Sequence, residues 1–212
     1  MGRRRNPPTA TASGARPSRG LNYPGQIRII GGQWRGRRLP VPISEGLRPT
    51  PDRVRETVFN WLAPVIEGAR CLDLFAGTGA LCLEALSRGA AAATMVEQSH
   101  AVVLHLRNLV TMLGADGEVI EANAIGYLSR FAGTTSTLPF DVVFVDPPFA
   151  SDLIAPCCAK VEQHGVLRPG GHAYIEAPHT LQPLPIPANW ELIRSKTAGA
   201  VGYHLVRRRV SL

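Results

Sequence analysis

The stretch DVVFVDPPFA (141–150) combines an acid, two prolines and an aromatic residue at the end of an apolar segment. Pro147 and Pro148 have fixed φ angles and no N–H groups, so they stiffen the chain after Asp146. On such a loop Phe149 could stack on an unpaired base, a contact worth about 1–3 kcal/mol. The Asp146 carboxylate and the Pro147 carbonyl could then accept the hydrogens of a planar amino group. The alternative is a loop that only ends a strand, which leaves the acid and the aromatic ring without a role.

A glycine-rich turn, DLFAGTG (73–79), has the composition of a ligand-binding loop. Gly77 and Gly79 allow a ligand to approach the backbone without meeting a Cβ atom. The helix expected after them would direct free N–H groups and a positive dipole at a carboxylate or a phosphate. A dinucleotide-binding fingerprint would need Gly or Ala at position 82, where this chain has Cys82. The turn indicates a ligand site, but by itself it does not identify the ligand.

Two further positions follow the next two expected strands. Glu97 ends the second strand, 24 residues after Asp73, where an acid can accept hydrogen bonds from both hydroxyls of an unphosphorylated ribose. Asn123 and Ala124 follow the third strand and are placed to meet an adenine edge. An ordinary acid at a helix start is the alternative for Glu97, because Ser99 follows it closely. The place of Glu97 relative to the glycine-rich turn favours the ribose role.

Alternating strands and helices from residue 70 onward would bring these groups together. β-branched and aromatic residues favour strands at 71–75, 91–97, 117–122, 141–146, 172–177, 190–196 and 200–209, the last two as an antiparallel pair. Helices are expected at 79–89, 99–113, 124–131 and 152–165, with a turn at 168–171 and an earlier helix that begins after Thr50 as its N-cap. This alternation predicts a mostly parallel sheet with helices on both faces, and ligands bind at the carboxyl edge of such sheets.

The first 38 residues hold nine arginines and no acid, whereas the rest of the chain is nearly neutral. Arginine favours phosphate pairing and base stacking, so this front suggests a polyanionic partner. Apolar runs around Gly31-Gly32 indicate a β-hairpin with Trp34 among Arg35, Arg37 and Arg38, which could contact RNA. One alternative is a merely solubilising front that reflects a general preference for arginine over lysine. Another is a solvated hairpin with Trp34 packed on the body.

Length and composition argue against several other classes of protein. A chain of 212 residues with 45% hydrophobic content suits one globular domain, and no apolar run approaches a membrane span. The N-terminal arginines are not followed by an apolar segment, so we expect no secretory signal. The four cysteines lack Cys-x-x-Cys spacing and the six histidines lack ligand spacing, so we expect reduced thiols, no metal site and a cytoplasmic location. Residues 1–26 are expected to be a disordered, arginine-rich tail.

The motifs FAGTG, Glu97 and DPPF, in this order, resemble those of class I S-adenosylmethionine-dependent amino-methyltransferases. Three longer segments narrow the resemblance: RIIGGQWRGRRL, LRPTPDRVRETVFNWL and LDLFAGTGALCLEALSRGA. Together they closely resemble the bacterial 16S ribosomal RNA guanine-N2 methyltransferase family, over roughly residues 27 to 209. DPPF alone is shared with DNA adenine-N6 and protein glutamine methylases. The combination of the RPTPDRVRE helix with the RIIGG hairpin is much more specific.

The resemblance implies an α/β fold of the Rossmann-like class I methyltransferase type, with a seven-stranded mostly parallel sheet and helices on both faces. An N-terminal β-hairpin extension would cover 27–50, and the methyltransferase domain 51–212. S-adenosylmethionine would be the methyl donor, bound by Asp73, Phe75, Gly77, Gly79, Glu97, Asn123 and Ala124. Catalysis would use Asp146, Pro147, Pro148 and Phe149, and RNA would be contacted by Arg28, Trp34, Arg35, Arg37, Arg38 and Arg53.

The expected substrate is the exocyclic N2 amine of a guanine in 16S rRNA of the small ribosomal subunit, with the protein acting as a monomer. The tail at 1–26 has no role in the family pattern, and we expect it to act as an electrostatic tether. A DNA adenine-N6 methylase is the nearest rival, but it would need a target-recognition domain for which the short linkers leave no room. The arginine-rich hairpin argues against a protein glutamine methylase, and Cys82 against a nicotinamide dehydrogenase. A non-catalytic ribosome-assembly factor would not need the DPPF acid.

Overall fold

The computed structural model describes residues 25–41, 50–131, 138–148 and 151–210, and the strands in these ranges form two sheets. The small sheet pairs β1 (Gly25–Arg28) with β2 (Arg38–Val41) antiparallel. The large sheet contains β3 (Arg70–Asp73), β4 (Ala92–Glu97), β5 (Gly117–Glu121), β6 (Phe140–Val145), β7 (Leu167–Pro178), β8 (Trp190–Ala198) and β9 (Val201–Arg208). Its order is β5-β4-β3-β6-β7-β9-β8, with β3 to β7 parallel and β9 antiparallel to both neighbours. The expected seven-stranded, mostly parallel sheet is confirmed.

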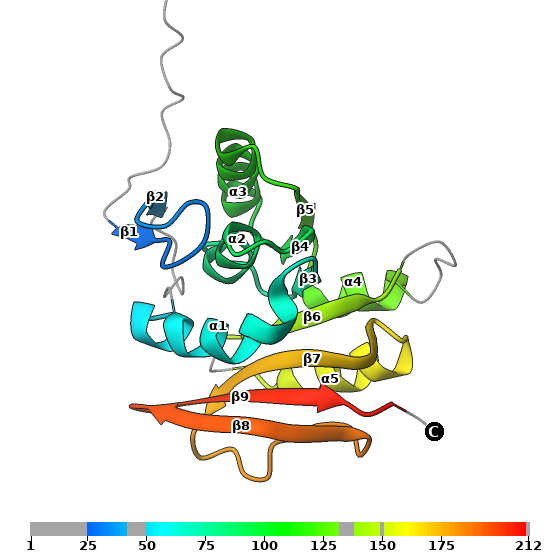
Figure 1. Cartoon of the computed structure of the whole chain (residues 1–212). Coiled ribbons are helices and arrows are strands. Elements are labelled where there is room, and N and C mark those ends of the chain that lie inside the picture. The colour runs from blue at the N-terminus through cyan, green and yellow to red at the C-terminus, as the bar shows by residue number, and fades with distance from the viewer. Residues whose placement is uncertain (1–24, 42–49, 132–137, 149–150, 211–212) are drawn as a thin grey trace, which may run out of the picture.

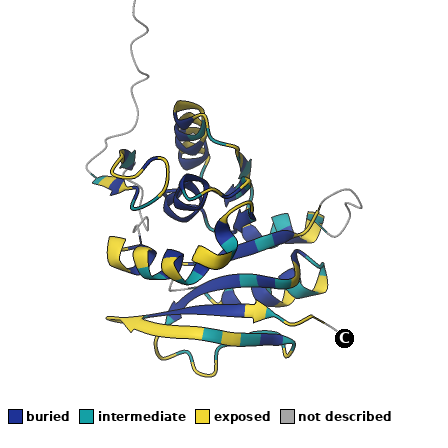
Figure 2. Ribbon diagram, viewed as in Figure 1, coloured by how far each residue is buried: buried dark blue, intermediate teal, exposed yellow. Residues whose placement is uncertain are grey.

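Helices cover both faces of the large sheet (Figure 1). One hydrophobic core contains side chains of α1 (Asp52–Ile66), α2 (Ala80–Ser87) and α3 (His100–Leu113). The other contains side chains of α4 (Ala124–Phe131) and α5 (Ile154–Gln163). Alternate residues of the central strands enter opposite cores, as the pleat requires: Val142 joins the first and Val143 the second. Figure 2 shows the inner strands and α2 buried, whereas much of β8 at the sheet edge is exposed.

The two adjacent glycines of the hairpin do not form the tight turn that the sequence suggested. β1 and β2 do pair, but their connection is the longer segment 29–37, and Gly32 packs against the end of α2. Gly32 has a φ of +76°, and a Cβ on it would lie 1.7 Å from the Ser87 carbonyl oxygen. The Gln33 N–H donates to this same carbonyl at 2.7 Å. The glycine therefore allows the connection to dock on α2 rather than to reverse the chain.

Replacing Gly32 with alanine should lower the free energy of unfolding by about 2–4 kcal/mol, because strain in the left-handed region adds to overpacking. Gly36→Ala is the matched control. Gly36 also has a positive φ, +82°, but no neighbouring atom lies within 4 Å of the position of its Cβ. This control should lose only about 1–2 kcal/mol. Urea unfolding followed by circular dichroism measures both losses, and equal losses would contradict the role given to the contact with Ser87.

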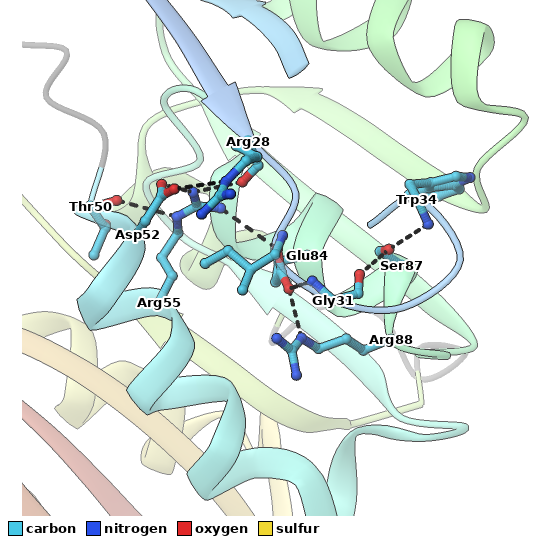
Figure 3. A network of polar contacts seen from close by, with 10 residues as sticks. Arg28, Gly31, Trp34, Thr50, Asp52, Arg55, Glu84, Ser87 and Arg88 are labelled. Atoms are coloured by element: carbon cyan, nitrogen blue, oxygen red, sulfur yellow. Dashed lines mark hydrogen bonds and ion pairs between the residues drawn. The ribbon is translucent and has the colours of Figure 1, made fainter. Parts of the chain in front are cut away.

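Glu84 forms ion pairs with Arg55 and Arg88, and these three residues are called the Glu84 network (Figure 3). The network links the connection between β1 and β2 to the helices. Glu84 of α2 is fully buried, and its carboxylate oxygens accept the N–H groups of Ile30 and Gly31, each at 2.8 Å. Arg88 Nε donates to Glu84 Oε1 at 2.7 Å, and Arg55 Nη1 lies 3.7 Å from Glu84 Oε2. One carboxylate thus joins α1, α2 and the connection between β1 and β2.

Arg55 extends the Glu84 network to the start of α1 (Figure 3). Its fully buried guanidinium donates to the carbonyl oxygens of Arg28 at 2.8 Å and Thr50 at 3.2 Å, and to the Asp52 carboxylate at 2.6 Å. The N-cap role expected for Thr50 is wrong, because α1 begins at Asp52 without a side-chain cap. The Thr50 hydroxyl instead lies 3.5 Å from Asp146 Oδ2. Arg55 thereby holds the backbone that presents Thr50 to the carboxyl edge of the sheet.

Several element limits differ from those expected. β1 begins at Gly25, two residues before the expected start of the hairpin, and the other residues of the expected tail lie outside the described ranges. α5 begins at Ile154, so Pro156 lies in its first turn, where a missing N–H is tolerated. The segment 168–171 belongs to β7 as an irregularity in its pairing with β6, rather than to a separate turn. Within the described ranges, no helix has the length and apolar character needed to span a membrane.

Candidate active site

Three strand ends place acids along the carboxyl edge of the sheet. Asp73 ends β3, Glu97 ends β4, and Asp146 directly follows β6. β3 pairs with both other strands, with Asp73 opposite Phe144 of β6. Because side chains alternate along a strand, Asp146 lies on the same face as Phe144 and Asp73. The structure therefore brings together the acids that the sequence assigned to one edge.

The glycine-rich turn after β3 is held in shape by two of these acids. Asp73 Oδ1 accepts the Phe75 N–H at 3.0 Å, and Glu97 Oε2 accepts the Gly77 N–H at 3.1 Å. Gly77 and Gly79 have φ angles of +49° and +75°, a region that residues with side chains rarely adopt. The turn leads directly into α2, whose first N–H groups lack partners within the helix. This local geometry is compatible with the ligand-binding role predicted for the turn, which stays a prediction.

Both roles considered for Glu97 are compatible with its contacts. Glu97 Oε1 accepts the Ser99 N–H at 2.7 Å just before α3, while Oε2 accepts the Gly77 N–H at 3.1 Å. The acid therefore does support a helix start. A carboxylate offers about four lone-pair sites, so two remain for hydroxyl groups of a ligand. The residue is half-buried, and its ribose role stays a prediction.

Asn123 and Ala124 lie at the start of α4, after β5. Asn123 is exposed, and its Oδ1 accepts the Gly126 N–H at 2.7 Å, which stabilises the first turn of the helix. Ala124 is the first residue of α4 and is 5% exposed. A helix cap accounts for the Asn123 side chain, and the adenine contact stays a prediction.

Burial changes the acid–base properties of this edge. Burial raises the pKa of Asp73 to about 7; the charges of Glu97 and Glu176 act in the same direction, and the hydrogen bond from Phe75 opposes them. The pKa of Asp146 is raised well above its usual range, first by burial and then by the charges of Glu176 and Asp73. Neighbouring carboxylates in a poorly solvated site cannot all ionise readily. Such perturbed acids are typical of functional sites.

The two prolines after Asp146 have different surroundings. Pro147 is buried and Pro148 is exposed. The Pro148 carbonyl accepts two hydrogen bonds from Ser151, from its N–H at 2.9 Å and from its Oγ at 2.6 Å. This carbonyl is thus engaged within the loop, and the acceptor role predicted for the Pro147 carbonyl is unaffected. Phe149 lies outside the described residues, so its stacking role stays a prediction.

The role expected for Trp34 needs correction. Trp34 is only 7% exposed and its ring packs in the hydrophobic core that contains α1, α2 and α3. The backbone N–H of Trp34 donates to Ser87 Oγ at 3.0 Å. A ring in this position is not available for a base to stack on, and the alternative of a packed side chain is the arrangement observed. The exposed residues of the predicted RNA surface are Arg28, Arg35, Arg37, Arg38 and Arg53, and their contacts with RNA stay predictions.

Glu176, on β7, was not singled out from the sequence but belongs to the same edge. It is 6% exposed, and the Tyr174 hydroxyl donates to its Oε1 at 2.5 Å. Val145 of β6 pairs with Ile175 of β7, so the next residues, Asp146 and Glu176, are neighbours across the two strands. The sequence pattern that indicated Asp146 was an acid at the carboxyl end of an apolar strand. The segment HAYIEA (172–177), which contains Glu176, has the same pattern.

Metal and thiol chemistry find no support in the described residues. None of their His, Cys, Asp and Glu side chains form a group of three or more that could hold a metal ion. All four cysteines are buried, and burial raises the pKa of Cys157 and of Cys158 to about 12. Their thiolate forms are therefore disfavoured, and the thiolate is the reactive form.

Comparison with known proteins assigns the chain to a family. A family model described as Conserved hypothetical protein 95 matches residues 27–207. The chain belongs to that family. Ribosomal RNA small subunit methyltransferase D of Escherichia coli strain K12 is 53% identical over 186 residues, which cover 87% of this chain and 91% of the relative. The protein of the same name from Haemophilus influenzae is 44% identical over 187 residues, 87% of this chain and 95% of that protein.

Solved structures agree with this assignment. A putative methyltransferase from Escherichia coli superposes with a TM-score of 0.78 and 49% identity, over 88% of this chain and all of that one. A putative methylase from Haemophilus influenzae has a TM-score of 0.74 and 38% identity, again over 88% of this chain and all of that one. A putative methyltransferase complexed with SAH has a TM-score of 0.65 at 16% identity, over 89% of this chain and 57% of that one. This last likeness concerns the fold alone.

Proposed function

We propose that this chain methylates ribosomal RNA, and that it transfers the methyl group from S-adenosylmethionine to the exocyclic N2 amine of a guanine in 16S rRNA. The observation that carries the proposal is the position of Asp146, at the carboxyl edge on the strand beside the glycine-rich turn. A rigidly held acid at this point suits an amine as the methyl acceptor. The 53% identity to a ribosomal RNA small subunit methyltransferase supports rRNA as the substrate class.

The residues of the edge fit S-adenosylmethionine as the methyl donor. Glu97 keeps two lone-pair sites for ribose hydroxyls, and Gly77 has no side chain to exclude a ligand. At Gly79 the missing Cβ instead makes room for Leu106, which would lie 2.7 Å from it. The N-terminus of α2 favours a carboxylate, as the methionine part of this cofactor carries. S-adenosylmethionine supplies an electrophilic methyl group on a sulfonium. The crystallised methyltransferase complexed with SAH has the same fold.

Asp146 and the Pro147 carbonyl would prepare the amine for attack. The N2 lone pair of guanine is delocalised into the ring, which makes this nitrogen a poor nucleophile. By accepting its hydrogens, the two groups draw them out of the ring plane and localise the lone pair. The N–C bond then forms as the C–S bond breaks, and the electron pair of that bond stays on sulfur. Orientation and stabilisation of the developing positive charge account for the rate.

The exposed arginines of the hairpin provide a surface for the RNA backbone. Arg28 and Arg38 are paired across β1 and β2, and with Gln26 and Asp52 they line a hollow of about 210 Å³. Guanidinium groups bind phosphate oxygens in a bidentate manner, and the two arginines outnumber Asp52, whose Oδ2 lies 3.2 Å from Arg28 Nε, so this hollow suits a backbone phosphate. The near-absence of acids at the front of the chain supports the same conclusion.

The test combines purified protein and labelled S-adenosylmethionine with unmethylated small ribosomal subunits, naked rRNA and DNA in parallel. The nucleic acids are then digested to nucleosides and analysed by mass. We expect N2-methylguanosine from ribosomal RNA. Label on adenine in DNA would contradict the substrate while leaving the site intact, and a protein that binds the cofactor but methylates none of the substrates would support the assembly-factor alternative.

Glu97→Ala should weaken S-adenosylmethionine binding by about 1–3 kcal/mol, because the ribose hydroxyls lose their acceptor. Glu118→Ala, which removes an exposed acid from neighbouring β5, is the matched control and should bind normally. Titration calorimetry measures both affinities, and thermal unfolding of the free proteins shows how much of the effect comes from the lost bonds to Gly77 and Ser99. Unchanged affinity of the first variant would place the ribose elsewhere.

A further inference from the structure

A second acid, Glu176 of β7, lies beside Asp146 at the carboxyl edge of the sheet. Val145 pairs with Ile175, and paired parallel strands lie about 4.8 Å apart, so Asp146 and Glu176 extend from adjacent positions of β6 and β7. Glu176 is 6% exposed and therefore has little access to water. Two carboxylates side by side at the carboxyl edge require groups that compensate their charge.

The Thr50 hydroxyl lies close to both carboxylates. It is 3.5 Å from Asp146 Oδ2, at the long end of the hydrogen-bonding range, and its proximity lowers the pKa of Glu176 as well as that of Asp146. Arg55 Nε binds the Thr50 carbonyl oxygen at 3.2 Å, so the backbone of Thr50 is fixed by a fully buried group (Figure 3). On the other side, the Tyr174 hydroxyl donates to Glu176 Oε1 at 2.5 Å.

We propose that Glu176 and Thr50 are positioning residues that act through Asp146: they hold it in a carboxylate pair that shares one proton, and this pair receives the proton that the amine loses on methylation. The inference rests on the proposed function and extends it by naming the group that accepts the proton. Neither Glu176 nor Thr50 needs to touch the substrate for this role.

The electrostatics of the pair agree with its geometry. Burial raises the pKa of Asp146 and of Glu176, and the Glu176 charge raises the pKa of Asp146 further. The other groups around the pair are Asp73 on β3, whose charge acts in the same direction, the Tyr174 hydroxyl on β7, and Tyr203, the residue of β9 that pairs with Glu176. Like charges at close range cannot both ionise readily, so one proton is retained at neutral pH.

The proton balance follows directly. Before transfer the pair carries one proton and Asp146 accepts the amine hydrogens. When the N–C bond has formed, the nitrogen is positively charged and passes one N–H proton to Asp146. The pair then holds two protons, and it returns one to water after the product leaves. The methylated amine is left neutral.

The decisive measurement is the pH dependence of single-turnover methylation of small ribosomal subunits at saturating S-adenosylmethionine. Asp146 must be ionised to accept the amine hydrogens, so the rate falls at acid pH as Asp146 is protonated. While the pair shares one proton, Asp146 is ionised in only part of the molecules, so the wild-type rate should rise with pH in two steps as the pair loses its two protons. Glu176→Gln leaves Asp146 without a coupled acid, so the rate should rise in a single step close to the lower wild-type step. Thr50→Val removes a hydroxyl that lowers the pKa of Asp146 and should move the profile to higher pH, whereas Thr50→Ser, which keeps the hydroxyl, should restore the wild-type profile.

Glu118→Gln is the control for loss of charge alone, because Glu118 is an exposed acid on β5. This variant should have the pH profile of the wild-type protein. A lower rate in Glu176→Gln with the wild-type pH profile retained would mean that Glu176 is only structural, and it would overturn the inference while the proposed function stood. If the wild-type protein methylates no substrate, the proposed function fails instead. Carboxyl carbon NMR of the free protein then still tests the pair: both titration steps seen at Asp146 and again at Glu176 support it, whereas one step at each residue overturns it.

Discussion

Asp146→Ala should lower the methylation rate by about 10²- to 10⁴-fold, the range typical of removing a group that handles a proton in the transition state. The amine would lose the acceptor that orients its hydrogens, and the Pro147 carbonyl alone cannot replace a charge. S-adenosylmethionine affinity should change little, because the residues predicted to bind this cofactor lie on β3, β4 and β5 and the turns that follow them. Single-turnover rates and calorimetric affinities, measured on the same preparation, separate the two effects.

Asp152→Asn is the matched control, since Asp152 is an exposed acid six residues further along the same loop and should retain wild-type activity. Asp146→Asn refines the result, because an amide preserves the size of the side chain but not its charge. We expect this variant to be nearly as slow as the alanine variant. A near-wild-type rate for Asp146→Ala would remove the DPPF acid from the mechanism.

Glu84→Leu should lower the free energy of unfolding by about 3–5 kcal/mol, the cost of leaving a buried charge without its partner. The substitution removes the ion-pair partner of Arg88 and leaves Arg55 with Asp52 alone. It also leaves the N–H groups of Ile30 and Gly31, which Glu84 now accepts at 2.8 Å, without an acceptor. The hairpin connection should lose its attachment to α2 first. Denaturant unfolding gives the free energy, and hydrogen exchange of the Ile30 and Gly31 amides locates the loss.

Glu56→Ala is the control for this second prediction, because Glu56 is an exposed acid on α1 and surface changes of this kind usually stay within about 0.5 kcal/mol. The double variant Arg55→Met with Glu84→Leu adds a further check. It should be less destabilised than the sum of the two single variants, since each single variant already breaks the contact between Arg55 and Glu84. Additive losses would mean that Arg55 and Glu84 do not act as a pair.

The sequence by itself determined the fold class and three of the four acids at the carboxyl edge. Periodicity predicted the order of strands and helices, and strand ends pointed to Asp73, Glu97 and Asp146, because the carboxyl ends of parallel strands meet at one edge whatever the details of packing. The family resemblance drawn from FAGTG, DPPF and the RIIGG hairpin is confirmed by the match over residues 27–207. These features depend on local patterns and spacing along the chain.

Only the tertiary structure decided what the polar residues of the N-terminal part contact. Glu84 is a single acid in the apolar run ALCLEALS, and nothing local indicates that it binds Ile30 and Gly31, more than fifty residues earlier in the chain. Trp34 gave no sign that it would be buried rather than offered to RNA. Thr50 has the residue type of a helix cap, yet its hydroxyl lies beside Asp146. The packing of the helices on the sheet decides which side chains far apart in the sequence make contact. Hydrophobic periodicity indicates the helices and strands, but it does not indicate these contacts.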